Sequence, residues 1–181
     1  MFTRIHRAAL AAGVGLLVSS GISTADQDPT TYVLRNYDAD GHLVSVVGDT
    51  GGAADVACSS GVEYPHYSPP PRAGSVLFKV RVKCDGQGAP PDIHVNGVLG
   101  FVPGDPAGPP PPPAPVEPRS VSSQTQRVPV PGEATYYTPA QGQPPVLGSH
   151  WYTGGYEAGF VAPIQGPIGN GDTPLVPVTT P

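Results

Sequence analysis

Proline and glycine place the strongest limit on what this chain can fold into. The 181 residues include 26 prolines and 24 glycines, a share of roughly 28 % that is typical of low-complexity or disordered chains. The prolines are spread unevenly, because 19 of the 26 lie in residues 103–181. We therefore predict two parts after the N-terminal segment: a small β domain over residues 26–102 and a largely disordered Pro/Gly-rich tail over residues 103–181.

The tail contains an uninterrupted proline run, Pro109 to Pro113. Such a run favours the polyproline II conformation, with a rise of about 3.1 Å per residue, and acts as a semi-rigid spacer. The alternative is a ligand for an aromatic groove on a partner protein. Because spacing alone explains most such tracts, we favour the spacer.

The first 25 residues have the pattern of a secretory signal peptide. Arg4 and Arg7 precede an apolar run over residues 8–18, and small residues follow up to Ala25; this order is typical of a cleaved signal. The run is shorter than the roughly 20 apolar residues that span a bilayer. An uncleaved anchor or a buried helix is the alternative. We predict an exported protein, secreted or associated with the cell envelope, with no membrane insertion after cleavage.

Cys58 and Cys84 are the two cysteines of the chain. An even pair in an exported protein predicts a disulfide bond, which stabilises a loop of this length by about 3.5 kcal/mol in the chain-entropy model. A metal site or a redox pair is the alternative. The spacing matches no zinc pattern and no Cys-x-x-Cys motif, so we favour the disulfide.

A β-hairpin is predicted near residue 40. Residues 31–37 and 42–47 are rich in β-branched and aromatic side chains, which favour strands. Between them lies Asp38-Ala39-Asp40-Gly41. This is a turn pattern, because Asp can bond nearby backbone groups and Gly readily adopts positive φ.

Further strands are predicted up to residue 102. Residues 75–84 alternate in polarity and place five apolar side chains on one face, Val76, Phe78, Val80, Val82 and Cys84. Residues 53–58 are a weaker strand candidate, and Asn96-Gly97 between two apolar runs predicts a second hairpin. We predict an all-β fold, a small antiparallel sandwich or open barrel with one disulfide.

Two aromatic segments are candidate contact surfaces. Tyr64, His66 and Tyr67 lie among prolines inside the disulfide loop, and loops on a rigid scaffold often carry function; an ordinary connection is the alternative. The second segment, residues 146–161, holds four further rings and a central Gly154-Gly155 that predicts an aromatic hairpin. The four rings are Trp151, Tyr152, Tyr156 and Phe160. They could bind a partner, or the segment could fold back onto the β domain or stay disordered.

Motifs for chemistry are weak in this sequence. Asp38-Ala39-Asp40-Gly41 resembles the start of a calcium loop, but the following residues favour a strand and position 49 is Asp49. We therefore predict no metal site and no cofactor. Without Arg4 and Arg7, seven basic residues face 14 acidic ones, a net charge of −7. This charge argues against binding to nucleic acids.

The function expected from these features is that of an exported, non-enzymatic interaction protein of the cell surface or the extracellular space. Its expected partner is a protein or a cell-wall carbohydrate. A structural, wall-associated spacer protein is one alternative. A small exported hydrolase is the other, because a Ser/His/carboxylate site is recognised by geometry and not by sequence order.

Overall fold

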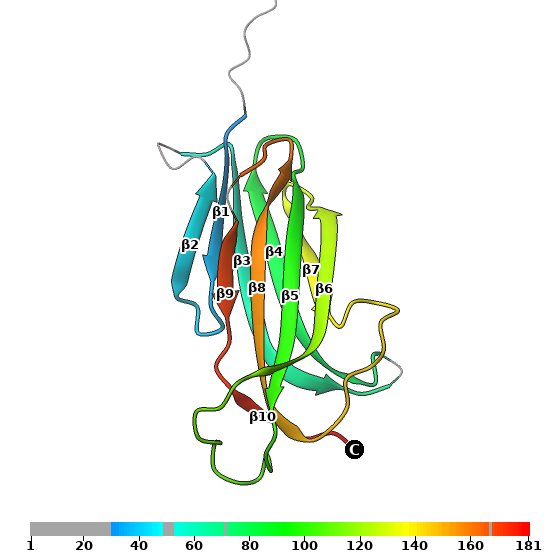
Figure 1. The fold of residues 1–181 in the computed structure, drawn as a ribbon. Coiled ribbons are helices and arrows are strands. Elements are labelled where there is room, and N and C mark those ends of the chain that lie inside the picture. Colours follow the sequence, from blue (N-terminus) through cyan, green and yellow to red (C-terminus); the bar gives the residue numbers. More distant parts are fainter. Residues whose placement is uncertain (1–29, 49–52, 71, 167) are drawn as a thin grey trace, which may run out of the picture.

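The computed structural model describes residues 30–48, 53–70, 72–166 and 168–181 (Figure 1). The predicted signal peptide lies outside these residues. The described chain forms ten strands: β1 (Tyr32–Tyr37), β2 (Leu43–Gly48), β3 (Val56–Ser68), β4 (Ser75–Gly86), β5 (Asp92–Val102), β6 (Glu117–Arg127), β7 (Gly132–Thr138), β8 (His150–Ala162), β9 (Gly169–Asp172) and β10 (Val176–Val178). Among the described residues, no helix is long and apolar enough to cross a membrane.

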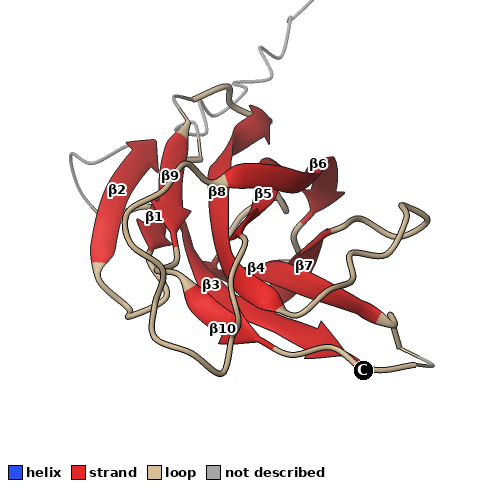
Figure 2. Cartoon of the chain, turned by 60° about the horizontal axis from the view of Figure 1, so that its bottom comes forward, coloured by secondary structure: helices blue, strands red, loops and turns tan. Residues whose placement is uncertain are grey.

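The strands form two sheets that pack face to face (Figures 1 and 2). One sheet has the order β2-β1-β3-β4-β7, and the other has the order β10-β8-β5-β6 with β9 paired to β8. The all-β prediction is confirmed. The first sheet is mixed and not wholly antiparallel, because β1 and β3 run parallel. A parallel pair needs a crossover, and here that crossover contains β2, which forms an antiparallel hairpin with β1.

The strands predicted on each side of residue 40 and at residues 75–84 are present. Leu34 of β1 pairs with Val47 of β2, and both side chains are buried in the core. In β4 the five residues of the predicted apolar face are all buried. Period-2 alternation identified these elements because one face of each strand contacts the core.

The hairpin predicted at Asn96-Gly97 is wrong, because both residues lie inside the continuous strand β5. Gly97 is needed there for space. A Cβ at this position would lie 2.2 Å from Thr138 Oγ1 and 3.0 Å from Ser122 Oγ, two hydroxyls that share a hydrogen bond of 2.7 Å. The dipeptide therefore marks a close approach between strands and not a turn.

The largely disordered tail is also corrected by the structure. Residues 117–178 supply β6 to β10, half of the ten strands, and each sheet contains strands from both sides of Val102. The prolines separate these strands instead of preventing them, because most lie in connections where no ladder hydrogen bond is needed. Those between β6 and β8 are Pro129, Pro131, Pro139, Pro144 and Pro145.

The proline run at residues 109–113 belongs to the connection between β5 and β6, which protrudes beyond the sheets (Figure 1). Four of its five prolines are exposed. Since β5 and β6 pair along most of their length, both ends of the connection return to the same sheet. The run is therefore a surface loop of the double sheet.

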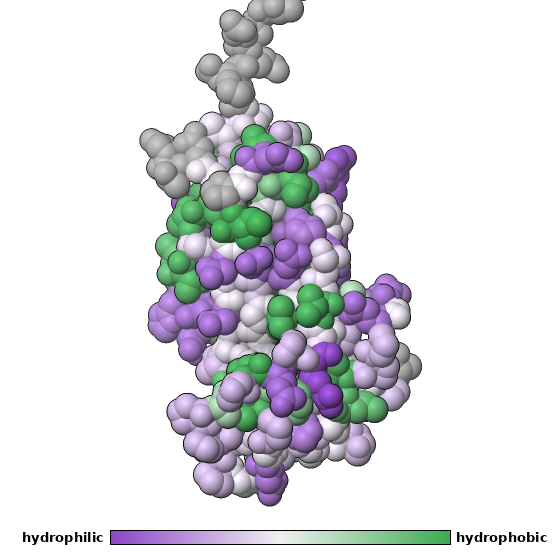
Figure 3. Space-filling view, viewed as in Figure 1, coloured by the Kyte–Doolittle hydropathy of each residue, from purple (hydrophilic) through white to green (hydrophobic). Residues whose placement is uncertain are grey.

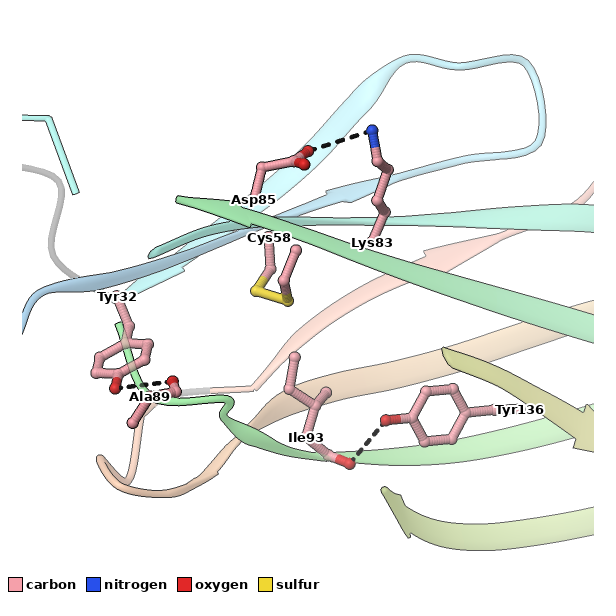
Figure 4. The surroundings of a disulfide bond; sticks show 8 residues. Tyr32, Cys58, Lys83, Asp85, Ala89, Ile93 and Tyr136 are labelled. Carbon is pink, nitrogen blue, oxygen red and sulfur yellow. Dashed lines mark hydrogen bonds and ion pairs between the residues drawn. A yellow bond between two sulfur atoms is a disulfide. The ribbon is translucent and has the colours of Figure 1, made fainter. Parts of the chain in front are cut away.

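The predicted disulfide is confirmed and joins neighbouring strands (Figure 4). Cys58 of β3 and Cys84 of β4 are paired residues, and both are buried in the core between the sheets. On the far side of this core, the Tyr136 hydroxyl donates a hydrogen bond of 3.0 Å to the Ile93 carbonyl. The sulfur atoms thus lie where β3 and β4 face the second sheet.

A buried polar cluster links the two sheets. The Ser60 hydroxyl donates to Asn36 Oδ1 at 2.6 Å, and its oxygen lies 2.7 Å from the Tyr156 hydroxyl, which also donates to the Tyr37 carbonyl at 3.2 Å. Burial raises the pKa of Tyr156 to about 12, and its proton is therefore retained at neutral pH. Ser60 of the first sheet thus connects two buried partners, one of them on β8 of the second sheet.

Replacing Ser60 by Ala should destabilise the fold by about 1–3 kcal/mol, because Asn36 and Tyr156 each lose a buried hydrogen-bonding partner. Chemical denaturation monitored by circular dichroism measures this loss. Ser59→Ala is the matched control, because Ser59 directly precedes Ser60 in β3 and is exposed. Its replacement should change stability by less than about 0.5 kcal/mol. Equal stability of the two variants would contradict a structural role for the cluster.

Candidate functional site

A groove lies on the outer face of the first sheet, at one end of β3, β4 and β7. Its volume is about 670 Å³. Two loops flank it, one between β3 and β4 and one between β7 and β8. The side chains that matter for its chemistry are His66, Tyr67, Arg72, Leu77, Lys79 and Tyr137.

Strand register brings these side chains together. His66 of β3 pairs with Leu77 of β4, and Lys79 of β4 pairs with Tyr137 of β7. Directly paired side chains share one face of a sheet. Leu77 is 5 % exposed and Tyr137 is 41 % exposed, so the side-chain surface that this pair offers to a ligand comes mainly from the tyrosine.

A β-bulge helps to set the position of His66. The β3–β4 register shifts between Glu63 and His66, and such a shift redirects the side chains that follow it. His66 Nδ1 lies 2.9 Å from the Tyr64 carbonyl oxygen. Because a carbonyl only accepts, Nδ1 carries the proton in this contact, and Nε2 is the ring nitrogen left for a ligand.

The loop between β7 and β8 forms a preorganised wall of the groove. Gln143 holds its first half, because its Oε1 accepts from the Ala140 amide at 2.8 Å and its Nε2 donates to the Val121 carbonyl at 3.0 Å. Val146 holds the second half through Ser75 Oγ at 2.9 Å and the Val76 amide at 2.8 Å. A wall fixed before binding loses little conformational entropy when a ligand arrives.

The charged side chains beside the groove form a ladder across three strands. Glu63 accepts from Lys79 at 3.2 Å and from Arg81, whose other nitrogen reaches Glu133 at 3.2 Å. Partial burial raises the pKa of Glu63, but the hydrogen bonds from Arg81 and Lys79 outweigh it and the pKa is lowered overall. Glu63 therefore stays ionised and holds the Lys79 ammonium in place.

The chain was compared with protein-family models, with curated proteins and with solved structures, and no match was found. The functional argument therefore rests on the groove itself.

The candidate contact residues inside the disulfide loop divide into two groups. They lie on strand β3 and not on an irregular loop, because β3 continues to Ser68. His66 and Tyr67 both line the groove. Tyr64 points elsewhere, since its hydroxyl donates to Asp40 in the β1–β2 turn.

The four rings of the second aromatic segment are all buried. Tyr152, Tyr156 and Phe160 lie in the shared core, and Trp151 is covered on the outer side, where its Nε1 donates to the Asp105 carbonyl at 3.2 Å. The hairpin predicted at residues 146–161 is absent because Gly154 and Gly155 lie within the continuous strand β8. The segment folds back onto the β domain, and we assign its rings to packing and not to a contact surface.

The histidine that best fits a hydrolase site makes other contacts. His94 Nδ1 lies 2.8 Å from Thr125 Oγ1, and His94 Nε2 lies 3.0 Å from Asn96 Oδ1. An amide oxygen accepts, so Nε2 carries the proton and cannot take one from Ser123, 3.2 Å away. Among the described residues, no carboxylate is hydrogen-bonded to the ring of His94.

The acidic pattern at residues 38–41 is a turn, as predicted. Asp38 Oδ1 accepts from the amides of Asp40 at 3.0 Å and His42 at 2.8 Å. The hydrogen bond from the His42 amide is the main cause of the lowered pKa of Asp38. These hydrogen bonds give Asp38 a structural role in the turn between β1 and β2.

Exposed apolar side chains also gather on the edge strand β2 (Figure 3). Leu43, Val44 and Val46 are 39–52 % exposed. This strip has no hydrogen-bonding side chain among its exposed members. The groove combines apolar, aromatic and hydrogen-bonding groups, and is therefore the better candidate for a specific binding site.

Leu77, Lys79 and Tyr137 were not among the contact residues singled out from the sequence, whereas Arg72 ends the Pro-rich segment that contains Tyr64, His66 and Tyr67. A signal for Tyr137 does exist, because Glu133, Thr135 and Tyr137 alternate with inward-facing residues of β7. Placing residues 103–181 in a disordered tail hid this alternation. Arg72 and Lys79 come together with Tyr137 only through loops and pairings distant in sequence.

Proposed function

We propose that this chain is an exported, non-enzymatic binding protein that holds a glycan chain of the cell envelope in the groove of β3, β4 and β7. The observation that carries the proposal is the partly exposed Tyr137 side chain beside hydrogen-bonding side chains in one groove. A flat aromatic ring packs against the C–H face of a sugar, and neighbouring polar groups bind its hydroxyls.

The groove is open enough for an extended polymer and rigid enough to select one. Its volume of about 670 Å³ lies in the range of small-molecule sites. Its strands belong to a disulfide-linked sheet, and Gln143 and Val146 hold its loop wall. Binding side chains on rigid elements keep their geometry better than those on mobile loops.

Export is supported by the predicted signal peptide and by the disulfide. The basic, apolar and small-residue order of residues 1–25 is typical of secretory signals. A buried structural disulfide persists in oxidising compartments outside the cytoplasm. A glycan of the envelope is therefore a ligand that the mature protein would meet.

Replacing Tyr137 by Ala should weaken binding to a soluble cell-wall polysaccharide at least tenfold, because stacking against the ring is lost. Affinity gel electrophoresis and NMR titration of the full mature chain with neutral and acidic polysaccharides measure the effect.

Tyr64→Ala is the matched control for this variant. Tyr64 is 38 % exposed, close to the 41 % of Tyr137, but lies outside the groove. Its replacement should leave glycan affinity unchanged. If no polysaccharide in the panel binds, or if both tyrosine variants bind like the wild-type protein, the groove is not a glycan site.

A further inference from the structure

We infer that the groove selects acidic glycans, whose sugars carry carboxylates, over neutral ones. This inference rests on the proposed function and specifies its ligand. It is carried by the positive charges of the side chains that line the groove. The chain as a whole is negatively charged.

The groove gathers cations on an acidic protein. Arg72 and Lys79 line it, and none of its lining residues is an Asp or a Glu. The full chain carries a net charge of −5 at pH 7. A chain of this charge repels polyanions in general, so a polyanion would approach favourably only where cations are concentrated.

Arg72 supplies the charge that is open to a ligand. Its side chain is exposed, and among the described residues it takes part in no ion pair. Its amide donates to the Pro69 carbonyl at 3.1 Å, which holds the backbone of this residue in a turn. A guanidinium presents parallel N–H groups that bind a carboxylate in bidentate fashion.

Lys79 supplies a second, positioned cation. Its side chain is 21 % exposed, and its Nζ lies 3.2 Å from Glu63. Glu63 is shared with Arg81, and Arg81 also pairs with Glu133, so two cations face two carboxylates in this ladder and the net positive charge of the groove comes from Arg72. The ammonium has three donors, and the Glu63 contact uses one of them.

Tyr137 favours a glycan over an acidic peptide as the occupant. Tyr137 pairs with Lys79 on the outer face of the sheet and is 41 % exposed, so a partly exposed aromatic ring and a cation lie side by side. Acidic sugars carry an apolar ring face and a carboxylate on the same residue, which matches this juxtaposition. A peptide of acidic side chains would engage the cations without requiring the ring.

The experiment compares oligogalacturonate with a neutral galactan oligosaccharide of the same length, using isothermal titration of the full mature chain. We expect the acidic oligosaccharide to bind at least tenfold more tightly at 20 mM NaCl. The difference should shrink at 200 mM NaCl, because salt screens exposed charges. Arg72→Gln should lower the affinity for the acidic ligand at least fivefold and leave the neutral ligand unaffected.

Arg35→Gln is the matched control, because Arg35 is an exposed arginine on β1 of the same sheet and is not part of the groove lining. It should behave like the wild-type protein. Equal affinity for both oligosaccharides, with loss of both in Tyr137→Ala, would overturn the charge inference and leave the proposed function standing. No binding of either ligand would overturn both.

A hexaglutamate peptide separates the two classes of polyanion. The inference predicts that it binds at least tenfold more weakly than oligogalacturonate. Binding of the peptide with equal affinity and the same dependence on Arg72 would overturn the assignment to a glycan. Thermal melts of all variants establish that each is folded.

Discussion

Replacing both Cys58 and Cys84 by Ala should lower the free energy of unfolding by about 2–5 kcal/mol. The bond links residues 26 positions apart in sequence, so its loss gives the unfolded chain more freedom. It also lies buried where β3 and β4 face the second sheet, and two smaller side chains leave a cavity there. A domain of this size has a net stability of only 5–15 kcal/mol, so the loss is a large fraction of the total.

Guanidinium denaturation of the mature protein, with and without reductant, measures this effect. The wild-type protein with dithiothreitol should move toward the double-alanine variant, while the variant itself should not respond to reductant. Superimposable curves for oxidised and reduced wild-type protein, with two titratable thiols in the purified sample, would disprove a stabilising disulfide.

Replacing Gly154 by Ala should destabilise the fold by about 1–3 kcal/mol, the usual cost of overpacking a core. A Cβ at this position would lie 2.1 Å from Cδ2 of Phe78, whose side chain is fully buried. Either the ring or the strand must move, and β8 is held by β5, β9 and β10 around it. Little room is therefore left to relieve the clash.

Gly155→Ala is an internal control for this prediction, because a Cβ on the neighbouring glycine meets no atom within 4 Å. It should change stability by less than about 0.5 kcal/mol or stabilise slightly, since Ala reduces the freedom of the unfolded chain. Thermal and chemical denaturation of both variants give the comparison. If Gly154→Ala were as stable as Gly155→Ala, the packing of Phe78 against β8 would be wrong.

The candidate site was predicted from the sequence only in part. His66 and Tyr67 were singled out because aromatic residues and prolines lie together, and both line the groove. Tyr137 was not, because it reaches the groove from β7, a segment far from β3 and β4 in the chain. Their juxtaposition depends on the pairing of β4 with β3 and β7, and local pattern carries no information on which distant strands pair.

Two glycine-containing dipeptides show where local turn rules failed. Asn96-Gly97 and Gly154-Gly155 both have the composition of hairpin turns, yet both lie within strands. In each case a glycine leaves space for a neighbouring side chain, Thr138 beside Gly97 and Phe78 beside Gly154. Glycine serves a turn and a close approach equally well, and only the neighbours in space decide which applies.

By itself, the sequence determined the all-β character, the disulfide and the strands β1, β2 and β4. Alternation and turn residues act over short distances, and a lone cysteine pair leaves one pairing. Only the tertiary structure decided that residues 117–178 complete both sheets. Their prolines indicate disorder when composition is averaged. Most of the same prolines lie between strands whose backbone groups are satisfied by β4, β5 and β8, partners that no local window contains.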